Sequence, residues 1–434
     1  MNLSIIGAGY VGLVSGACFA EFGAKVTCID NNKERINQLN KGLIPIYEPG
    51  LSELVSRNVS AERLFFTSNL QDSVKDSDLV FIAVGTPARR GDGHADLKYV
   101  YAVADEIAEH LRENTVVVNK STVPVGTARE VKRIINKANP DLNFHIASNP
   151  EFLREGSAIE DFMKPDRVIL GLENEHSEKI LNELYKPLNS IKTPILSTDL
   201  ESAELIKYAS NAFLATKVSF INEISLLCEK TGADVHKVAQ GMGLDTRIGS
   251  KFLQVGPGYG GSCFPKDTQA LVRMAQENEA SSRIIEAVIE VNASQKARMI
   301  SKIREAIGGS VLDKRIGVLG LTFKAETDDM RDAPSLSILP ALLDKGAKIT
   351  AHDPEGIEEA RKLLPEALKY ADNIEEAIKH ADAVILMTEW SQYKQMDLEA
   401  MKKMMKGDIF VDLRNIYDKE RMRSLGYKYY CIGR

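Results

Sequence analysis

The chain has 434 residues, of which 44% are hydrophobic and 27% are charged, and its formal net charge is −6. At roughly 150 residues per domain, this length predicts about three domains, or two with a shared connecting region. The acidic balance argues against a nucleic-acid partner, which usually needs a basic face. No run of 18 apolar residues is present, so we expect no membrane span. The N-terminus has no basic segment ahead of its apolar residues, so we expect no signal peptide.

The first 200 residues alternate strand and helix patterns. Helical patterns occupy, for example, residues 97–111 and 128–138. Strands are expected at residues 3–6, 25–30, 64–67, 79–84, 115–118, 144–147, 167–170 and 195–196. Strands that alternate with helices predict parallel β-α units.

The middle of the chain has a different pattern. Apolar residues recur at helical spacing over 199–231, and a second long pattern covers 283–307. No strand pattern of comparable strength lies between 199 and 310. These long helices offer apolar surface to a second copy of the chain, so we expect a homo-oligomer, at least a dimer.

The last 120 residues alternate again, and they repeat parts of the first half. Strands are expected at 316–319, 348–352, 384–388, 409–413 and 427–432. Gly-Ala-Lys-Val-Thr-Cys-Ile-Asp at 23–30 matches Gly-Ala-Lys-Ile-Thr-Ala-His-Asp at 346–353, and 76–84 resembles 380–388 in the same order. Two unrelated matches to a common pattern are the alternative. The repeat favours an α/β fold with two Rossmann-like, doubly wound domains, 1–198 and 311–434, joined by a long-helix central region, 199–310.

The segment Gly7-Ala-Gly-Tyr-Val-Gly12 follows the first strand and precedes a helical pattern. In a G-x-G-x-x-G motif the glycines permit a tight turn, close approach to a pyrophosphate and close helix–strand packing. Asp30 ends the next strand, where a carboxylate can bind a ribose 2′-hydroxyl and repel a 2′-phosphate. We therefore expect NAD rather than NADP as cofactor, although Arg35 nearby weakens the distinction. A glycine-rich turn without a ligand is the alternative.

The second repeat has only Gly317-Val-Leu-Gly320 after its first strand, followed by Phe323 and Lys324. Without the full motif, a second dinucleotide is not expected. The aromatic and the cation at a strand end favour a mononucleotide or sugar-nucleotide phosphate, and an exposed lysine is the alternative.

The segment 256–267, Gly-Pro-Gly-Tyr-Gly-Gly-Ser-Cys-Phe-Pro-Lys-Asp, leads through four glycines to Cys263. Pro265 can open a helix, so Cys263 is expected beside a helix N-terminus with Lys266 nearby. Both features lower a thiol pKa. The other four cysteines, at 18, 28, 228 and 431, lie in apolar patterns typical of small core residues. Scattered thiols without a C-x-x-C pair predict a reduced, cytoplasmic protein.

A reactive cysteine beside an NAD site has a chemical logic, because an aldehyde must become tetrahedral before it can lose hydride. Thiolate addition gives a thiohemiacetal, hydride loss gives a thioester, and water releases the acid. An inert cysteine in a glycine-rich turn is the alternative.

Other polar residues are expected near strand or helix ends. Lys207 and Asn211 share a helix face and can stabilise an oxyanion, unless that face is merely solvated. Glu151 and Glu155 follow a strand, where one can act as a general base or both can serve a helix dipole. The segment 120–126 also ends a strand. The seven histidines show no metal-ligand spacing, so no metal is expected.

The sequence closely resembles the UDP-glucose 6-dehydrogenase family over essentially its whole length. The motifs in register are Gly7–Gly12, Lys120–Val125, Ser148–Leu153, Gly258–Asp267 and Thr388–Trp390. Members of this family oxidise a nucleotide sugar twice at C6 with two NAD. The resemblance therefore implies UDP-glucose as substrate and UDP-glucuronate as product.

The resemblance also implies roles for individual residues. The implied catalytic set is the nucleophile Cys263, the oxyanion pair Lys207 and Asn211, the proton-handling carboxylate Asp267, the acid/base Glu151, and Thr122, which positions a water. The implied NAD contacts are Gly7, Gly9, Tyr10, Val11, Gly12, Asp30, Arg35, Thr86, Thr122, Glu155, Lys266 and Arg331. The implied substrate contacts are Glu151, Phe152, Leu153, Lys207, Asn211, Arg247, Phe252, Tyr259, Gly260, Phe323, Lys324 and Arg414. Arg247 matches a position that can reach the site of a neighbouring subunit, and Arg414 is a looser match.

Three other functions are compatible with parts of this pattern. Related dehydrogenases act on GDP-mannose or on N-acetylated UDP-sugars, and no single residue of the sequence identifies which sugar is accepted. Two-electron hydroxyacid dehydrogenases also join a Rossmann domain to long helices, but they need no cysteine at position 263. A redox sensor that binds NAD would have no need for Lys207, Asn211, Cys263 and Asp267 together.

Overall fold

The computed structural model describes residues 1–89 and 93–434. The chain forms two compact units. The first comprises Met1–Ser210 and Arg273–Glu279, and the second comprises Asn211–Val272 and Ala280–Arg434. Within the described residues, none of the helices combines the length and apolar character that a membrane span requires.

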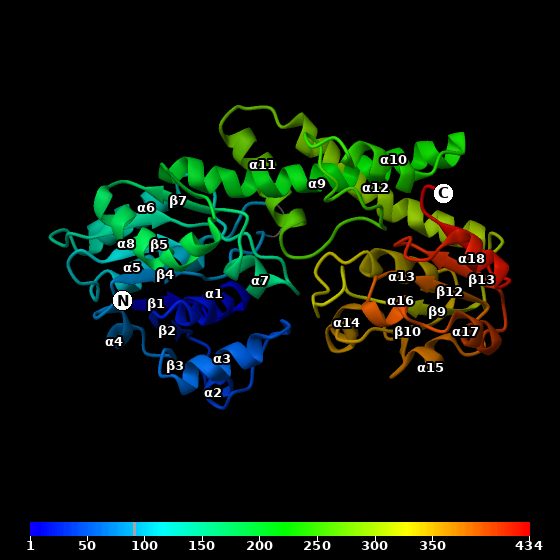
Figure 1. Ribbon diagram of the computed structural model, residues 1–434, viewed down its shortest axis with the longest axis horizontal. Coiled ribbons are helices and arrows are strands. Elements are labelled where there is room, and N and C mark those ends of the chain that lie inside the picture. The colour runs from blue at the N-terminus through cyan, green and yellow to red at the C-terminus, as the bar shows by residue number, and fades with distance from the viewer. Residues whose placement is uncertain (90–92) are drawn as a thin grey trace. The chain divides into compact units, whose positions relative to one another are not determined.

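The first unit is built on one sheet (Figure 1). Its strands are β1 (Asn2–Ile6), β2 (Lys25–Ile29), β3 (Leu64–Thr67), β4 (Leu79–Ile82), β5 (Val116–Asn119), β6 (His145–Ser148), β7 (Val168–Leu172) and β8 (Ile195–Thr198). Their order in the sheet is β3-β2-β1-β4-β5-β6-β7-β8. The reversal of chain order between β1 and β4 is the feature that creates a ligand crevice in doubly wound folds.

One strand pair differs from the parallel pairing that the sequence predicts. β7 runs antiparallel to β6, whereas the six strands from β3 to β6 are parallel to their neighbours. The segment between β6 and β7 contains only the short helix α7 (Ala158–Met163). β7 in turn pairs parallel with β8, so the direction of the sheet changes once, between β6 and β7.

Helices cover both faces of this sheet. They are α1 (Tyr10–Glu21), α2 (Lys33–Asn40), α3 (Leu51–Ser60), α4 (Leu70–Val74), α5 (Lys98–Ile107), α6 (Thr127–Ala138), α8 (Glu175–Leu184) and the 3-10 helix η1 (Lys186–Ile191), in addition to α7. Alternate strand residues enter different cores. Leu79 and Phe81 pack with α1, α3 and α7, whereas Val80 and Ile82 pack with α4, α5 and α6. Both faces are therefore apolar, as the continuous apolar run of β4 predicts.

Long helices follow, as predicted. They are α9 (Leu200–Thr231), α10 (Val235–Gly243), α11 (Phe264–Glu277) and α12 (Arg283–Ala306). α9 and α12 match the two long helical patterns to within one residue at each end, and no strand lies between β8 and β9. All residues of that interval are described.

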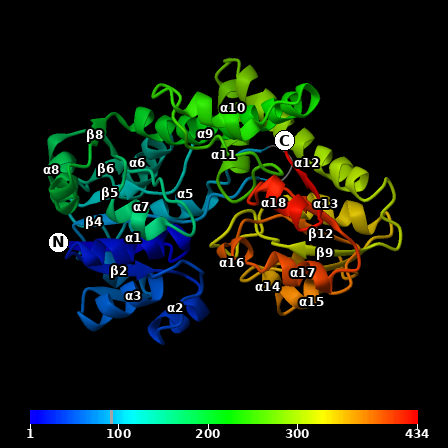
Figure 2. The same cartoon turned by 45° about the vertical axis from the view of Figure 1, so that its right-hand side comes forward.

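The second unit contains a smaller sheet (Figure 2). Its strands are β9 (Arg315–Leu319), β10 (Lys348–His352), β11 (Lys369–Tyr370), β12 (Ala383–Leu386), β13 (Ile409–Asp412) and β14 (Lys428–Cys431), in the order β11-β10-β9-β12-β13-β14. Its helices are α13 (Ser335–Leu343), α14 (Ile357–Leu363), α15 (Ile374–Ile378), α16 (Ser391–Lys394), α17 (Leu398–Met404) and α18 (Lys419–Ser424). Ala383 and Ile385 face a core with α12 and α13, and Val384 and Leu386 face a second core.

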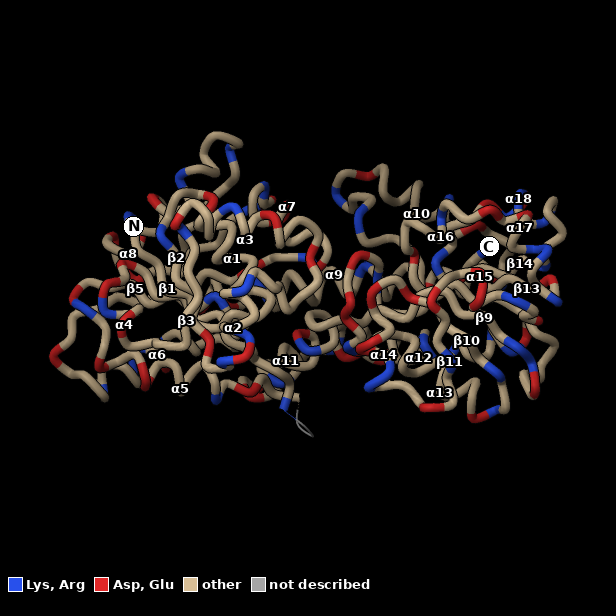
Figure 3. The backbone as a smooth tube through the Cα atoms, turned by 90° about the horizontal axis from the view of Figure 1, so that it is seen from below, with Lys and Arg blue, Asp and Glu red and all other residues tan. Residues whose placement is uncertain are grey.

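The internal repeat corresponds to equivalent strands of two sheets. In the first sheet, β2 and β4 pair with opposite edges of β1. In the second sheet, β10 and β12 pair in the same way with opposite edges of β9. The predicted fold class, two Rossmann-like sheets with a helical central region, is confirmed. The two-residue strand β11 was not predicted. Lys and Arg are interspersed with Asp and Glu along both units in Figure 3.

Candidate active site

Each glycine of the first loop occupies its position for a different structural reason. Gly7 has a φ of +104°, and its N–H donates to the Ile29 carbonyl at 2.7 Å. A Cβ on Gly12 would lie 1.7 Å from the Gly7 carbonyl oxygen, so only glycine permits this close packing. A Cβ on Gly9 would meet nothing within 4 Å. The loop therefore leaves open space in front of α1, which begins at Tyr10 without a side-chain cap.

Asp30 organises the same loop. Its Oδ2 accepts from the Ala8 N–H and from Arg35 Nη1, each at 2.9 Å, and its Oδ1 accepts from the Asn32 N–H. The open space at Gly9, the uncapped helix N-terminus and the carboxylate at the end of β2 fit the pyrophosphate and adenosine ribose of NAD. Arg35, which the sequence placed nearby, is in direct contact with Asp30.

Thr86 and Thr122 lie at the carboxyl edge of the same sheet. Thr86 follows β4, Thr122 follows β5, and the Thr86 hydroxyl donates to the Thr122 carbonyl at 2.8 Å. In an open α/β sheet, ligands bind outside the carboxyl ends of the strands. The structure thus places both threonines where the sequence expects ligand contacts.

Glu151 forms a buried ion pair with Lys207 of α9, with 3.0 Å between Oε1 and Nζ. Its Oε2 accepts from the Leu153 N–H at 2.6 Å. Burial raises the pKa of the Glu151 carboxyl, but the Lys207 ion pair, the Leu153 hydrogen bond and Lys120 outweigh burial and hold the pKa below its usual range. Lys207 Nζ also lies 5.2 Å from the centre of the Phe152 ring. Glu151 is therefore a carboxylate at neutral pH.

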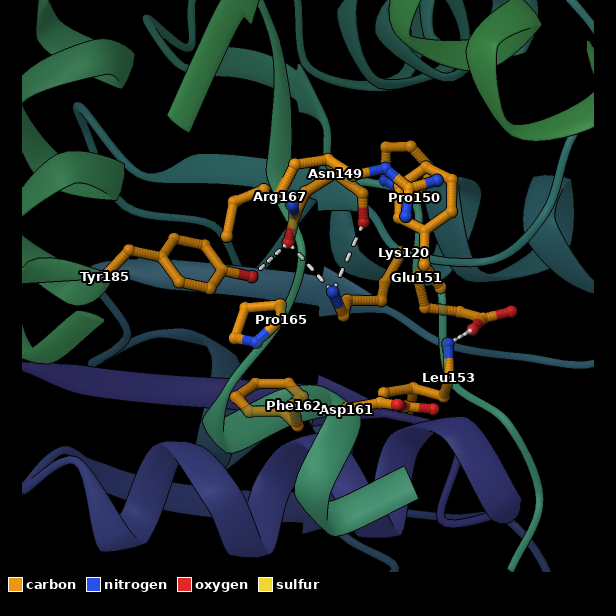
Figure 4. Close-up of a pocket in the computed structure, with 12 residues that line it drawn as sticks. Lys120, Asn149, Pro150, Glu151, Leu153, Asp161, Phe162, Pro165, Arg167 and Tyr185 are labelled. Atoms are coloured by element: carbon orange, nitrogen blue, oxygen red, sulfur yellow. Dashed lines mark hydrogen bonds between the residues drawn. The ribbon is translucent and has the colours of Figure 1, made fainter. Parts of the chain in front are cut away.

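Figure 4 shows a pocket of the first unit that Glu151 lines. Its lining includes Lys120, Asn149, Glu151, Phe152, Leu153, Arg167 and Tyr185. The Arg167 guanidinium stacks 3.7 Å from the Phe152 ring centre. Arg167 and Tyr185 were not predicted, because their sequence neighbourhood is typical of an ordinary strand and helix. Asn149 lies in the motif Ser148–Leu153 but was given no role of its own.

Glu48 is a buried carboxylate that no sequence motif selected, and it connects the first loop to the Glu151 segment. Glu48 accepts from the Tyr10 hydroxyl and from the N–H groups of Gly156 (2.6 Å) and Ala158 (2.8 Å). Burial raises the pKa of Tyr10, and Glu48 and Glu155 raise it further. Glu48 lies 108 residues before Gly156, and no local pattern reports such a distant contact.

The second unit contains the cysteine loop. Cys263 immediately precedes α11, and its carbonyl accepts from the Asp267 N–H at 2.8 Å in the first helical turn. The Ser262 hydroxyl lies 3.5 Å from the Cys263 Sγ, which is half-buried. The predicted setting beside a helix N-terminus is confirmed. Such a setting favours the thiolate.

The glycines before Cys263 allow this loop to pack closely against the chain after β9. A Cβ on Gly260 would lie 2.4 Å from the Asp332 carbonyl oxygen, and a Cβ on Gly261 would lie 2.7 Å from the Phe323 ring. The Gly261 N–H donates to the Arg331 carbonyl at 2.7 Å. The four glycines therefore define a fixed loop and not a flexible one.

Lys207 and Asn211 each contact a different carboxylate. The sequence predicts a cation and an amide acting together from one face of α9. Asn211 donates from Nδ2 to Asp267 Oδ2 at 2.6 Å, whereas Lys207, one turn earlier, pairs with Glu151. Asp267 is buried and also bonds Lys266 Nζ.

Several predicted substrate residues of the second unit lie close together: Phe323, Lys324 and Arg414. Arg414 Nη2 donates to the Phe323 carbonyl at 2.6 Å, and Arg414 Nε pairs with Glu389 at 3.0 Å. Lys324 Nζ lies 5.4 Å from the centre of the Phe323 ring. The buried Tyr259 donates from its N–H to Asn292.

Three further predicted residues are held by their own neighbours. Arg331 pairs with Asp329, and the exposed Arg247 pairs with Asp245. Phe252 adopts a left-handed φ of +64°, and its ring centre lies 6.1 Å from that of Phe264.

The remaining cysteines are buried thiols. Burial raises the pKa of Cys18 and of Cys28 to about 12, and that of Cys431 to about 11. Such thiols are inert at neutral pH. Across the part of the chain that the structure describes, no group of three or more potential metal-ligating side chains is found.

The fold and these contacts define a class. The first unit has the geometry of an NAD-binding Rossmann domain, and the chain also carries a cysteine at a helix N-terminus, which together are typical of a nicotinamide-dependent dehydrogenase. Family models agree. Residues 1–189 match the NAD binding domain, 201–294 the central domain, and 317–419 the UDP binding domain of the UDP-glucose/GDP-mannose dehydrogenase family. The chain belongs to this family, and NAD, the cofactor predicted from the fingerprint and Asp30, is confirmed.

Individual relatives cover the whole chain. The UDP-glucose 6-dehydrogenase of Rhizobium meliloti (strain 1021) is 54% identical over 100% of both chains. The UDP-glucose 6-dehydrogenase TuaD of Bacillus subtilis (strain 168) is 48% identical over 100% of this chain and 93% of its own. Among solved structures, a UDP-glucose dehydrogenase from Pyrobaculum islandicum is 39% identical, with a TM-score of 0.91 over 99% of this chain and 96% of its own. A UDP-D-ManNAc dehydrogenase from Pyrococcus horikoshii is 25% identical, with a TM-score of 0.88 over 100% and 99%.

Proposed function

We propose that this protein oxidises UDP-glucose twice at C6 to UDP-glucuronate, through a thiohemiacetal and a thioester on Cys263. The observation that carries the proposal is the setting of Cys263, which follows a tightly packed glycine loop and directly precedes α11. The 54% identity to a UDP-glucose 6-dehydrogenase over the full length supports UDP-glucose as the substrate.

Each step assigns work to particular side chains. The Cys263 thiolate attacks the C6 aldehyde, and cationic and amide donors such as Lys207 and Asn211 stabilise the resulting oxyanion. NAD, when bound, accepts a hydride in each of the two oxidations. Asp267, which already accepts a hydrogen bond from Asn211, receives and returns protons.

Hydrolysis of the thioester needs a base for the attacking water. Glu151 suits this role because its ion pair with Lys207 keeps it ionised. As the carboxylate takes a proton from water, the new C–O bond forms, the C–S bond breaks, and the Cys263 thiolate leaves. Thr122 positions this water, at the strand edge that it shares with Thr86.

The same site is compatible with a second substrate, because the UDP-D-ManNAc dehydrogenase has the same fold over the whole chain. The test is NADH production over a panel of UDP-glucose, UDP-N-acetylhexosamines and GDP-mannose. We expect UDP-glucose to give the highest kcat/KM and two NADH per sugar. One NADH per sugar would show that the protein carries out only a two-electron oxidation of the alcohol and not the four-electron reaction.

A homodimer is part of the proposal. Leu205, Phe213, Phe220 and Leu227 are spaced by eight, seven and seven residues along one side of α9, and each is at least 45% exposed. Such a stripe typically covers a partner helix. Arg247, whose side chain is 87% exposed, is available to reach a neighbouring subunit. Mixing Arg247→Ala with Cys263→Ala subunits should restore part of the activity, and an active monomer in sedimentation would contradict the dimer.

We also propose a cytoplasmic location for this protein. All five cysteines lie in the described part of the chain, and none forms a disulfide. Free thiols are the normal state in a reducing compartment.

A further inference from the structure

Lys120 is a buried cation to which the proposed reaction assigns no task. It follows the last residue of β5, and its side chain is only 4% exposed. Nζ donates to Asn149 Oδ1 at 3.0 Å and lies 3.5 Å from the Asn149 carbonyl oxygen (Figure 4). Both acceptors are neutral. In the described residues no carboxylate lies within ion-pair distance of this ammonium group, which is unusual because buried charges are normally paired.

The groups around Lys120 hold it in place without neutralising it. Asn149 Oδ1 also accepts from the buried Tyr185 hydroxyl at 2.6 Å, and Asn149 Nδ2 donates to the Ile169 carbonyl at 2.9 Å. The Phe162 ring centre lies 5.7 Å from Lys120 Nζ. This packing fixes the ammonium group on the wall of the pocket that Glu151 also lines.

Burial lowers the pKa of Lys120, Glu151 opposes this effect and Lys207 adds to it, and the resulting pKa is about 8. Lys120 is thus still a cation at neutral pH. A protein that tolerates an unpaired buried charge beside a carboxylate gains a local field at that carboxylate.

We propose that Lys120 is a positioning residue for the reaction: with Lys207, it keeps the Glu151 carboxylate ionised, so that Glu151 accepts a proton from the attacking water. This inference rests on the proposed role of Glu151. Lys207 forms the ion pair and the hydrogen bond with Glu151. Lys120, at the end of β5, adds a second positive charge on the wall of the pocket that Glu151 lines.

Other charges face the same pocket and must be considered. Arg167, just before β7, stacks on Phe152 and adds positive charge from a third element. Asp161 of α7 opposes it, but Arg154 pairs with Asp161 at 2.9 Å and neutralises its effect. Lys120 differs from Arg167 in being fully buried, so water screens its charge least.

The test compares Lys120→Met with Tyr185→Phe. Both variants alter the hydrogen bonds at Asn149 Oδ1, but only the first removes a charge. In protein labelled with 13Cδ-glutamate, the Glu151 signal is assigned by its loss in Glu151→Gln and titrated directly. We expect Lys120→Met to raise the titration midpoint of Glu151 by about one pH unit, because a nearby cation typically lowers a carboxyl pKa by one to three units. Tyr185→Phe should leave the midpoint unchanged.

The same shift should appear in turnover. The acid limb of the pH profile of kcat should move upward by about one unit in Lys120→Met and stay in place in Tyr185→Phe. A Glu151 midpoint that does not move in Lys120→Met overturns the inference, whatever the activity. If Lys120→Met does not fold, Lys120→Gln is titrated with the same criterion.

Failure of the proposed function gives a different result. In that case the wild-type protein makes no NADH with any nucleotide sugar, while the Glu151 titration still reports the effect of Lys120.

Discussion

In both sheets the first strand ends at a glycine of positive φ, Gly7 at +104° and Gly320 at +92°. Each donates its N–H to the last residue of the neighbouring strand, Ile29 at 2.7 Å and His352 at 2.8 Å. The residue after that strand is an aspartate in both units. Asp30 accepts from the Ala8 N–H and Asp353 from the Leu321 N–H, so the two loops share one frame.

The loops then diverge. Gly9 leaves open space, whereas its counterpart Thr322 bonds Asp353 through both its N–H and its hydroxyl. α1 begins directly at Tyr10, but in the second unit the next helix, α13, begins only at Ser335. A pyrophosphate needs both the open approach and the helix N-terminus.

The two aspartates are also occupied differently. Asp353 accepts from the N–H groups of Leu321, Thr322, Glu355 and Gly356, and from Trp390 Nε1. Asp30 shares one oxygen with a half-exposed arginine, Arg35. The same fold thus supplies this frame twice, and a few side chains decide which copy can bind a dinucleotide.

The largest expected effect comes from removing the nucleophile of the second unit, which should stop turnover but leave NAD binding by the first unit intact. Cys263→Ala should lower turnover by about three orders of magnitude or more, because no other group forms the thioester. Its affinity for NAD should be unchanged, since the fingerprint and Asp30 belong to the other unit. Cys263→Ser should also lose turnover, because a serine hydroxyl is hardly ionised near neutral pH. NADH production and NAD titration measure the two effects, and near-normal uronic acid synthesis by Cys263→Ala would reject the mechanism.

The next effect comes from exchanging the residue that distinguishes the loops. Gly9→Thr copies Thr322 into the first loop, and the φ of −77° at Gly9 suits threonine. We expect the Kd for NAD to rise about 100-fold, because the side chain fills the approach to the helix N-terminus. The free energy of unfolding should be unchanged. The reverse variant, Thr322→Gly, should bind no NAD at the second sheet. Undiminished NAD affinity in Gly9→Thr would show that the open space is not the cofactor's.

The paired aspartates should respond in opposite ways. Asp30→Ala should lower the preference for NAD over NADP about tenfold, because the repulsion of a 2′-phosphate disappears. Asp353→Ala should leave this preference intact but reduce the free energy of unfolding by about 3 kcal/mol, since it leaves buried donors unpaired. Cofactor kinetics and urea unfolding distinguish the two outcomes. Equal use of NADP by the wild-type protein would contradict the assignment of Asp30.

The smallest effect compares two cations that follow equivalent strands. Arg414, after β13, is paired with Glu389, whereas Lys120, after β5, is not paired with a carboxylate. Arg414→Met should destabilise the protein, because Glu389 loses its partner. Lys120→Met should stabilise it by about 1 kcal/mol at pH 7, because an unpaired buried charge is removed.

This gain should depend on pH. The folded pKa of Lys120 is about 8, below the value of about 10.4 in an unfolded chain. Between these values the unfolded state binds more protons, so wild-type stability rises with pH. The advantage of Lys120→Met should therefore be full below pH 8 and shrink toward pH 10 in urea unfolding. Lys75→Met, at an exposed helix end, is the control and should show no such dependence.

Local patterns determined most of the fold. Strand alternation, helical spacing and the repeat of residues 23–30 at 346–353 are properties of short segments, and they located both sheets and the long helices. The fingerprint and Asp30 were equally readable, because their geometry belongs to one β-α unit. The glycine loop before Cys263 was recognised from its composition, although its packing against Phe323 and Asp332 is a long-range contact. The antiparallel β7 and the short β11 were missed, since strand direction depends on pairing across the sheet.

Tertiary structure alone decided which side chains meet. Lys207 and Asn211 share one helix, and the structure shows that each contacts a carboxylate 56 residues away in the sequence. Glu48 drew no functional prediction, because a glutamate in a loop is usually solvated. Lys120 belongs to a segment expected at the ligand edge of the sheet, but it was given no role of its own. Only the fold shows that both are buried, and burial is what turns an ordinary charge into one that positions a loop or sets the ionisation of Glu151.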